Sequence, residues 1–286
     1  MLELSTNDKK QLEGLNISVE QVERQVNQFR TGFPYSDLIA PATIGNGIVK
    51  FSDTEVQELI KQFDEDKQYY DILKFIPASG AASRMFKNIY SFIEEYKGKE
   101  IPEDFLRKEN IKADSIESFF INIRDFAFYD DLKNKMAECD KDINTLLNEN
   151  KLVDIAEFLL ENKGLGYGKL PKALLKFHKY KETSRYALEE HLVEAAQYST
   201  ADTEEGIVAQ LHFTVSQEHL NIFKKVVEEV VPRYEEQFGI RYDISYSVQK
   251  PSTDTVAVDM NNEPFRNNDG SLLFRPGGHG ALIQNL

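Results

Sequence analysis

The sequence predicts an α/β fold with a Rossmann-like, mostly parallel sheet, a helical N-terminal extension and a helical insertion. Short apolar runs of strand length alternate with longer amphipathic stretches, which is typical of parallel strands connected and covered by helices. Apolar residues recur with helical spacing in two further blocks. We therefore expect a helical extension over residues 1–70 and an α/β domain over residues 71–286 that contains a helical insertion at about 98–165.

The N-terminal extension carries two helix-start signals. Residues Ser18–Gln21 and Ser52–Glu55 both have the spacing of a capping box, in which a serine and a Glu or Gln three residues later satisfy each other's backbone N–H groups. An amphipathic run follows each signal. Between them, residues 32–35 and 40–47 contain Gly and Pro at short intervals and predict irregular loops.

The α/β domain has five strand-like runs and three helix-like runs outside the insertion. The predicted strands are Ile72–Ala78, Ile207–Val215, Tyr242–Gln249, Thr255–Asp259 and Ser271–Phe274. The predicted helices are Ala81–Tyr96, Ser184–Tyr198 and Gln217–Phe238. Because the first two strands are each followed by a predicted helix, we expect a sheet with helices on both faces.

Composition narrows the class of protein. The chain has 286 residues, 41% of them hydrophobic and 29% charged, and no apolar run approaches the roughly 20 residues that span a bilayer. The N-terminus lacks the cationic and apolar regions of a signal peptide, so we expect a cytoplasmic protein without a membrane partner. The single cysteine, Cys139, cannot form an internal disulfide and excludes a zinc site built from several cysteines.

The formal net charge of −14 argues against a nucleic-acid partner, because such a surface repels phosphate backbones. No basic stripe with interleaved aromatic residues is present. On an acidic protein, a polyphosphate ligand needs positive charge that is focused locally by side chains, helix ends or a metal ion. Isolated cationic residues are therefore better candidates for a polyphosphate site on this protein than they would be on a basic one.

The first candidate site is the small-residue loop Ala78–Ser83 with Arg84 behind it, between a predicted strand and a predicted helix. Small residues let a ligand approach the backbone, and a helix that starts there would point its free N–H groups at an anion. Arg84, one turn into that helix, would offer a guanidinium matched to phosphate oxygens. The loop is neither a P-loop nor a Gly-x-Gly-x-x-Gly turn. The alternative is an ordinary strand-to-helix connection.

The second candidate is the stretch Gly164–Phe177, where three alternating glycines precede Pro171 and Lys172. The glycines predict a flexible entry to this segment. Lys169 or Lys176 could assist Lys172 in contacting a ligand. The alternative is a solvated flank before an apolar segment.

The third candidate joins Gln249, at the end of a predicted strand, to the glycine-rich run Gly277, Gly278, His279 and Gly280. Such a run needs backbone freedom, and His279 can donate a hydrogen bond to a phosphate or a ribose. The alternatives are an exposed strand end for Gln249 and a simple turn for the glycines. Of the remaining histidines, His212 is expected to be structural and His191 to lie at the surface or the edge of the core, whereas His178 and His219 have no partners in the sequence pattern.

In their order, these segments resemble the sugar-phosphate nucleotidyltransferases (nucleotide-sugar pyrophosphorylases), and most of all their UDP-sugar pyrophosphorylase branch. The signature of these enzymes reads Leu-x-Gly-Gly-x-Gly-Thr-Arg-Met/Leu, followed later by Pro-Lys. Ser79 and Gly80 match its first two glycines, Ala82 the third, Ser83 the Thr and Arg84 the Arg, so two of the three glycines are replaced. The resemblance covers about residues 72–286. The whole chain also looks like an uncharacterised bacterial family of unknown function.

The resemblance implies a nucleotide-diphospho-sugar transferase type of sheet and a role for each candidate residue. Arg84 would hold the β and γ phosphates of a nucleoside triphosphate, the backbone around Ala78–Ser83 would cradle them, and Lys172 would contact the transferring or acceptor phosphate. Gln249 would contact the edge of a uracil base, and Gly277–Gly280 would close over base and ribose.

The implied reaction is transfer of a nucleotidyl group from a nucleoside triphosphate, with UTP favoured, to a sugar 1-phosphate with release of pyrophosphate. Mg²⁺ is the implied cofactor, held by an aspartate that follows the glycine-rich loop and is expected beyond residue 286, in a longer parent protein; Asp254 and Asp259 are alternative ligands. Two other functions stay open. The chain could bind a nucleotide or sugar phosphate without catalysis, or it could be a helical interaction scaffold.

Overall fold

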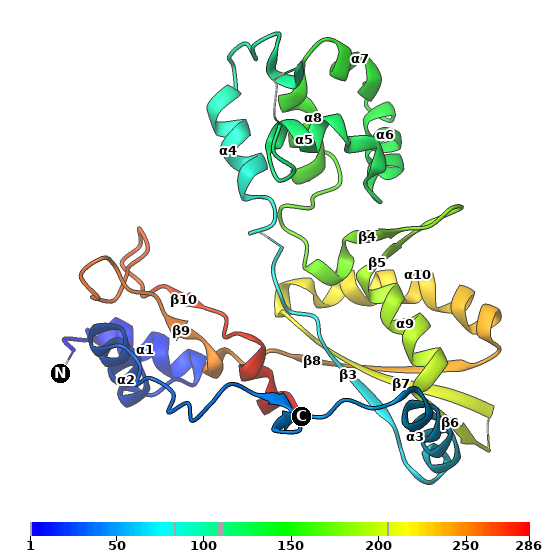
Figure 1. The fold of residues 1–286 in the computed structure, drawn as a ribbon. Helices are drawn as coiled ribbons and strands as arrows, with labels where there is room; N and C mark the ends of the chain where they lie inside the picture. The colour runs from blue at the N-terminus through cyan, green and yellow to red at the C-terminus, as the bar shows by residue number, and fades with distance from the viewer. Residues whose placement is uncertain (1, 83, 108–110, 205) are drawn as a thin grey trace. The chain divides into compact units, whose positions relative to one another are not determined.

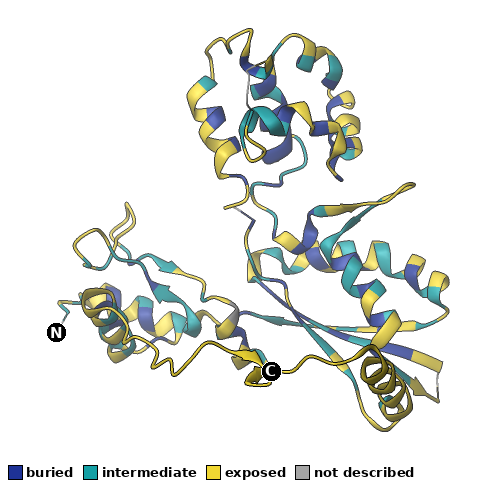
Figure 2. Cartoon of the chain, viewed as in Figure 1, coloured by how far each residue is buried: buried dark blue, intermediate teal, exposed yellow. Residues whose placement is uncertain are grey.

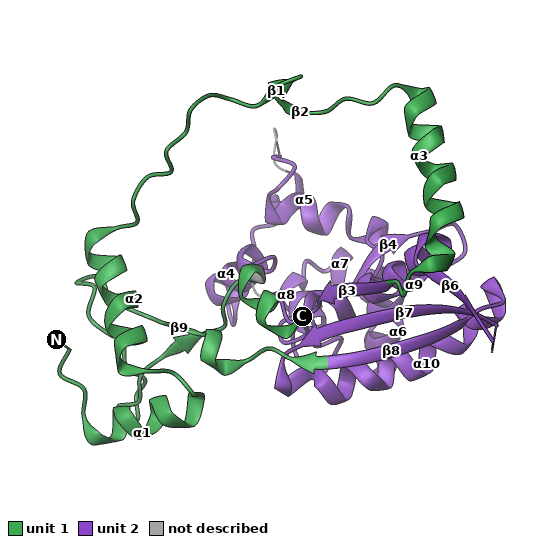
Figure 3. Ribbon diagram, turned by 90° about the horizontal axis from the view of Figure 1, so that it is seen from below, with its two compact units in different colours: residues 1–72, 247–286 green, residues 73–246 purple. Residues whose placement is uncertain are grey.

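In the computed structural model, which describes residues 2–82, 84–107, 111–204 and 206–286, the chain forms two compact units (Figure 3). Unit 1 combines residues 1–72 with residues 247–286, and unit 2 comprises residues 73–246. This division differs from the boundary expected near residue 70, because the C-terminal 40 residues group with the N-terminal segment rather than with the sheet.

Unit 2 contains a four-stranded mixed sheet centred on β7 (Gly206–Val215). Strand β3 (Leu73–Pro77) runs parallel to β7 and pairs with residues 210–214, whereas β6 (Thr200–Thr203) runs antiparallel and pairs with residues 206–209. Strand β8 (Arg241–Val248) also pairs with β7, and the arrowheads of β3, β7 and β8 point the same way in Figure 3. The sheet is thus smaller than expected, and its assignment to a Rossmann type stays a prediction.

Two helices of unit 2 pack on one face of this sheet. Side chains alternate between the faces of a strand, and the buried ones of β7, such as Leu211 and Phe213, contact both α9 (Ala187–Tyr198) and α10 (Leu220–Phe238). On the opposite face, Phe75 stacks on His212 with 5.2 Å between ring centroids. Helices α9 and α10 therefore share one face of the sheet, and the expected covering of both faces by helices stays a prediction.

A β-hairpin precedes α9 where the sequence predicted the start of a helix. Strands β4 (Lys176–Lys179) and β5 (Ser184–Tyr186) pair antiparallel. The helix begins only at Ala187, because the side chain of Glu189 accepts a hydrogen bond from the Tyr186 N–H and fixes the first turn there.

A helical part of unit 2 has its own hydrophobic core (Figures 1 and 2). Its buried residues include Phe92, Phe120, Leu132, Ile155 and Leu159. The helices are α4 (Lys87–Tyr96), α5 (Ile116–Ile121), α6 (Tyr129–Ala137), α7 (Ile143–Asn148) and α8 (Leu152–Leu160). It includes the predicted insertion and extends it by α4.

Unit 1 is built from both ends of the chain. Helices α1 (Thr6–Leu15) and α2 (Val19–Thr31) share a core with the antiparallel strands β9 (Thr255–Val256) and β10 (Phe274–Arg275). The last two predicted strands are therefore shorter than expected and pair with each other in a separate sheet. Unit 1 also contains β1 (Thr43–Ile44), β2 (Gly47–Ile48) and α3 (Asp53–Asp66).

Of the two predicted capping boxes, the one at Ser52 and Glu55 forms completely. At α2, Ser18 accepts from the Gln21 N–H, but the Gln21 side chain donates to the Ser252 carbonyl instead of closing the box. Short 3₁₀ helices complete the elements: η1 (Lys67–Tyr69), η2 (Phe105–Arg107), η3 (Ile123–Asp125), η4 (Lys172–Leu174), η5 (Gln217–His219), η6 (Pro251–Thr253) and η7 (His279–Asn285).

Over residues 2–82, 84–107, 111–204 and 206–286, no helix has both the length and the apolar character needed to cross a membrane.

Candidate functional site

The small-residue loop after β3 does not lead directly into a helix. Helix α4 begins at Lys87, and Arg84 lies before it in a turn rather than one turn inside it. The expected presentation of helix N–H groups to a ligand at Gly80 is therefore wrong. The physical reason is that the backbone at Ala78 and Gly80 is engaged elsewhere: the Ala78 N–H continues the ladder to the Thr214 carbonyl at 2.7 Å.

The loop instead pairs with the second candidate segment. The Lys172 N–H donates to the Gly80 carbonyl at 3.0 Å, and Ala81 and Pro171 form an antiparallel β-bridge. Two segments that are far apart in the sequence, and that the resemblance places in one site, are thus joined through their backbones. This contact places both at the carboxyl end of β3, which is the edge where open α/β sheets bind ligands.

His219 ties the same segment to β7. Its Nε2 lies 2.7 Å from the Lys169 carbonyl, and since a carbonyl can only accept, Nε2 carries the hydrogen. In the neutral ring, Nδ1 then accepts from the Ser216 hydroxyl at 2.6 Å. Ser216 directly follows β7, so the carboxyl ends of two parallel strands and the Lys169–Lys172 segment meet at one edge of the sheet.

Three exposed cations accompany this edge: Arg84, Lys169 and Lys172. In the part of the chain that the structure describes, none of the three has an ion-pair partner. Lys176, considered as an assistant, differs from them because its Nζ pairs with Asp131 at 2.6 Å. The edge therefore carries positive charge that an anion could use on a protein whose net charge is −14.

The other residues of the loop have varied surroundings. Ala78 is buried in the core of the sheet and Ala82 in the core of the helical part, so their side chains do not face solvent. Ser79 and Gly80 are half-buried and Ala81 is exposed. Ser83 lies outside the described residues.

The glycines before Lys172 serve close packing rather than flexibility. A Cβ added to Gly164 would lie 1.8 Å from the Phe158 carbonyl oxygen, and one on Gly168 would lie 2.0 Å from the Tyr90 hydroxyl. The segment runs along the end of α8, where the N–H groups of Leu165 and Gly168 donate to carbonyls of that helix. The approach to Lys172 is thus anchored on α8.

The third candidate site lies in unit 1. Gln249 is buried, and its Nε2 donates to the Gly277 carbonyl at 2.9 Å, so the two predicted elements are in contact. Gly277 is required there, because an added Cβ would lie 2.8 Å from the Thr253 carbonyl oxygen. Gly278 and Gly280 are exposed, and the side chain of His279 is not among those described. Since these residues belong to a different unit from Arg84 and Lys172, the expected convergence on one cleft stays a prediction.

Across the described ranges, the structure contains no group of three or more His, Cys, Asp or Glu side chains arranged to hold a metal. Asp259 accepts hydrogen bonds from the N–H groups of Asn261 and Glu263, which occupies it within a turn. Burial raises the pKa of Asp254, which the Gly277 N–H partly offsets. These residues do not form a ligand set for Mg²⁺.

A comparison with protein families matches residues 5–286 to the family described as Domain of unknown function (DUF4301). The chain belongs to the DUF4301 family. No curated protein and no solved structure matches it. The family match agrees with the expected resemblance to an uncharacterised family, and the likeness to nucleotidyltransferases remains a proposal.

Sequence reasoning missed His219 in this DUF4301 chain. The spacing Ser216-x-x-His219 places a hydroxyl and an imidazole three residues apart at the start of a helical segment, and it could have indicated the contact between them. The contact with the Lys169 carbonyl, 50 residues away, has no local signal because it depends on the packing of two segments.

Proposed function

We propose that the DUF4301 chain binds the polyphosphate of a nucleoside triphosphate at the carboxyl edge of β3 and β7, and transfers its nucleotidyl group to a sugar 1-phosphate. The observation that carries this proposal is the pairing of the Gly80 loop with Pro171 and Lys172. A chance resemblance in two unrelated segments would give no reason for them to touch.

Each residue has a role that its position allows. Arg84 and Lys172 are exposed cations on the two paired segments, and they would neutralise phosphate oxygens. The backbones around Gly80 and Pro171 hold these two segments together, so both cations stay at the same edge of the sheet. Lys169, whose carbonyl is held by His219, would add a third cation.

The proposed reaction needs no nucleophile from the protein. An oxygen of the sugar phosphate attacks the α-phosphorus in line, a new P–O bond forms, and the bond to the β-phosphate oxygen breaks to release pyrophosphate. The protein contributes positioning and charge stabilisation. The described residues provide no ligand set for Mg²⁺, so the proposed charge stabilisation comes from the protein's own cations.

The alternative of binding without catalysis has one specific observation in its favour. Ser79 and Ala82 stand where the resemblance expects glycines, and the Ala82 side chain is 1% exposed within the helical core. A filled position there limits how closely a phosphate approaches the backbone.

The test measures UTP affinity by calorimetry for the wild-type chain and for Arg84→Ala. Hydrogen bonds to charged groups contribute about 1.5–3 kcal/mol, so we expect Arg84→Ala to weaken binding about 10- to 100-fold. Arg84→Lys should recover part of this, because an ammonium keeps the charge and loses the bidentate fork. Lys172→Gln should also weaken binding. The matched control is Lys181→Gln, because the Lys181 side chain is 94% exposed.

Melting temperatures measured on the same samples separate binding from stability. Unchanged affinity with reduced stability in Arg84→Ala would assign this residue to the scaffold and contradict the phosphate role. Release of pyrophosphate from UTP and a sugar 1-phosphate supports transfer, whereas UTP binding without release supports the non-catalytic alternative.

A further inference from the structure

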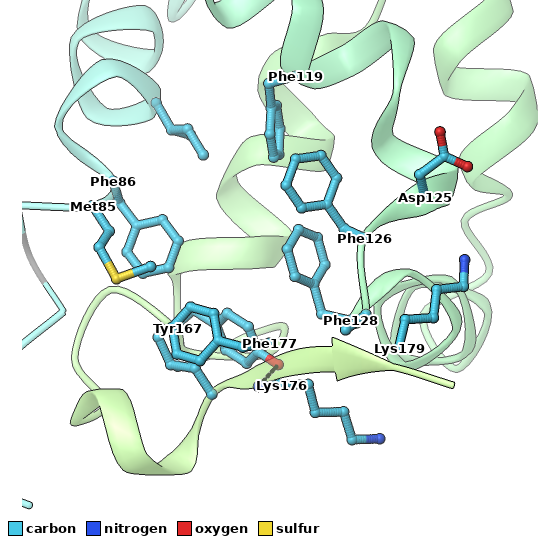
Figure 4. Close-up of a pocket in the computed structure, with 13 residues that line it drawn as sticks. Met85, Phe86, Phe119, Asp125, Phe126, Phe128, Tyr167, Lys176, Phe177 and Lys179 are labelled. Atoms are coloured by element: carbon cyan, nitrogen blue, oxygen red, sulfur yellow. Dashed lines mark hydrogen bonds between the residues drawn. The ribbon is translucent and has the colours of Figure 1, made fainter. Parts of the chain in front are cut away.

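A cavity of about 350 Å³ lies in unit 2 between the helical part and the hairpin strand β4 (Figure 4). Residues from α4, the 119–128 segment, Tyr167 and β4 surround it. Small-molecule sites in proteins span about 300–1,000 Å³, so the cavity is large enough for a small ligand.

The walls of the cavity are mainly aromatic. The ring of Phe126 stacks on Phe128 with 5.1 Å between centroids and lies 5.2 Å from Phe119. Tyr167 packs edge-on against Phe128 at 5.7 Å, and its hydroxyl accepts a hydrogen bond from the Lys176 N–H at 3.3 Å. Figure 4 shows these rings around one space. Because the rings pack on one another, the lining is fixed before any ligand arrives.

Part of this aromatic lining faces solvent. Phe126 is 38% exposed, Phe177 is 43% exposed and Met85 is 45% exposed. Apolar area left in water costs about 25 cal/mol per Å², so three large apolar side chains around one concave site favour an apolar occupant.

The charged groups that line the cavity determine which charge on a ligand is attracted there. Lys176 is paired with Asp131, whereas the Nζ of Lys179 donates to the Arg124 carbonyl at 2.7 Å and has no carboxylate partner among the described residues. Asp125 also lines the cavity and repels anions. An acidic group on a ligand would therefore be attracted by Lys179 and opposed by Asp125.

We propose that this cavity binds a small flat aromatic molecule that carries one acidic group, independently of the proposed nucleotide site. The aromatic ring stacks among Phe126, Phe128 and Phe177, and the acidic group lies toward Lys179. Met85 and Leu175 line the cavity close in sequence to Arg84 and Lys172, so the experiment must separate the two sites.

The experiment titrates the full chain with 2-naphthoate and with uncharged 2-naphthalenemethanol and follows naphthalene fluorescence. The chain contains no tryptophan, so the probe can be excited apart from the protein. We expect Phe126→Ala and Phe177→Ala to weaken binding of both probes about tenfold, in line with the strength of aromatic pairs. Lys179→Gln should weaken only naphthoate, about two- to fivefold, and Asp125→Asn should strengthen it. Lys181→Gln is the control.

Three outcomes would overturn the proposal. One is that neither probe binds, and another is that binding is the same in wild type, Phe126→Ala and Phe126→Leu when circular dichroism shows all three to be folded. The third is displacement of naphthoate by UTP together with loss of naphthoate binding in Arg84→Ala, which would make the cavity part of the nucleotide site.

Discussion

At the scale of single residues, Asp8 shows how a buried carboxylate is stabilised. Its side chain is 2% exposed, and Arg266 donates to its two oxygens at 2.7 and 2.9 Å. These hydrogen bonds, helped by the Ser5 N–H, hold the pKa of Asp8 well below its ordinary value of 3.8, although burial acts in the opposite direction. Asp8 joins the start of α1 to the C-terminal part of unit 1.

The lowered pKa makes the stability of unit 1 depend on pH. Because the folded chain binds this proton more weakly than the unfolded chain, Asp8 stabilises the fold fully above its unfolded pKa of 3.8. The contribution falls as the pH drops below that value. We expect Asp8→Asn to lower the free energy of unfolding by about 1–3 kcal/mol at pH 7, since Arg266 loses a charged partner.

Urea unfolding at pH 7 and pH 3, followed by circular dichroism, checks this prediction. The difference between wild type and Asp8→Asn should shrink at the lower pH. Asp37→Asn, at an exposed position in the same unit, is the control and should have little effect at either pH. A difference that is as large at pH 3 as at pH 7 would mean that the carboxylate charge contributes nothing.

At the scale of elements, the sequence located two strands of the sheet, β3 and β7, more closely than the start of helix α4. The apolar runs of β3 and β7 indicated both strands to within one residue, because burial imposes their composition. The start of α4 was misplaced by six residues, from Ala81 to Lys87. Alanine and serine fit a helix locally, and the bond from the Lys172 N–H to the Gly80 carbonyl, which overrides that preference, joins residues too far apart for any local pattern.

For the candidate site as well, the sequence indicated some features and not others. Local composition was enough to select the Gly80 loop, whereas Lys172 and Gln249 were selected through the order of segments in the resemblance to the nucleotidyltransferases. It could not show that the loop pairs with Pro171, or that Gln249 donates to Gly277, because these contacts arise only when distant segments fold together. Candidate residues can thus be selected from the sequence, whereas their contact partners require the structure.

A prediction at this scale concerns the glycine segment after α8. We expect Gly164→Ala to destabilise unit 2 by about 1–3 kcal/mol, because the new Cβ overlaps backbone that cannot move without breaking the end of the helix. The clash is with the Phe158 carbonyl, at 1.8 Å. Gly14→Ala is the matched control, since no atom lies within 4 Å of its added Cβ and alanine favours a helix there. Thermal unfolding measures both variants.

If Gly164→Ala unfolds at the wild-type temperature, the segment has room that the structure does not show, and its glycines would instead provide flexibility. That result would also weaken the argument that Lys172 is held in place by α8.

At the scale of the whole molecule, the two ends of the chain fold as one unit. The side chain of Gln11 brackets the backbone of Leu272, donating to its carbonyl at 2.8 Å and accepting from its N–H at 2.9 Å. Gln25 does the same for the Asp254 carbonyl and the Val256 N–H. Residues from both ends share a buried core: Leu12, Ile17, Val22 and Val26 with Val256 and Leu272.

This arrangement predicts that a destabilising substitution in α2 also loosens the strands near the C-terminal end of the sequence. In Val22→Asp, a carboxylate replaces a side chain that is 0% exposed, and burying an unpaired polar group costs at least about 2 kcal/mol. Hydrogen exchange of residues 255–275 should then accelerate about 30-fold, because a tenfold change corresponds to about 1.4 kcal/mol. Amides of β7, in unit 2, should keep their wild-type rates, since they lie in a separate core.

Asn27→Asp adds the same carboxylate at an exposed position of the same helix and should leave both regions unchanged. Equal acceleration in β7 and in residues 255–275 would mean that the two units unfold as one body. Unchanged exchange in residues 255–275 would mean that α2 does not support the C-terminal strands, and Gln249 with its glycine loop would then need another source of rigidity. The choice between these outcomes decides whether Gln249 and its glycine loop are held in place by the N-terminal helices of the same unit.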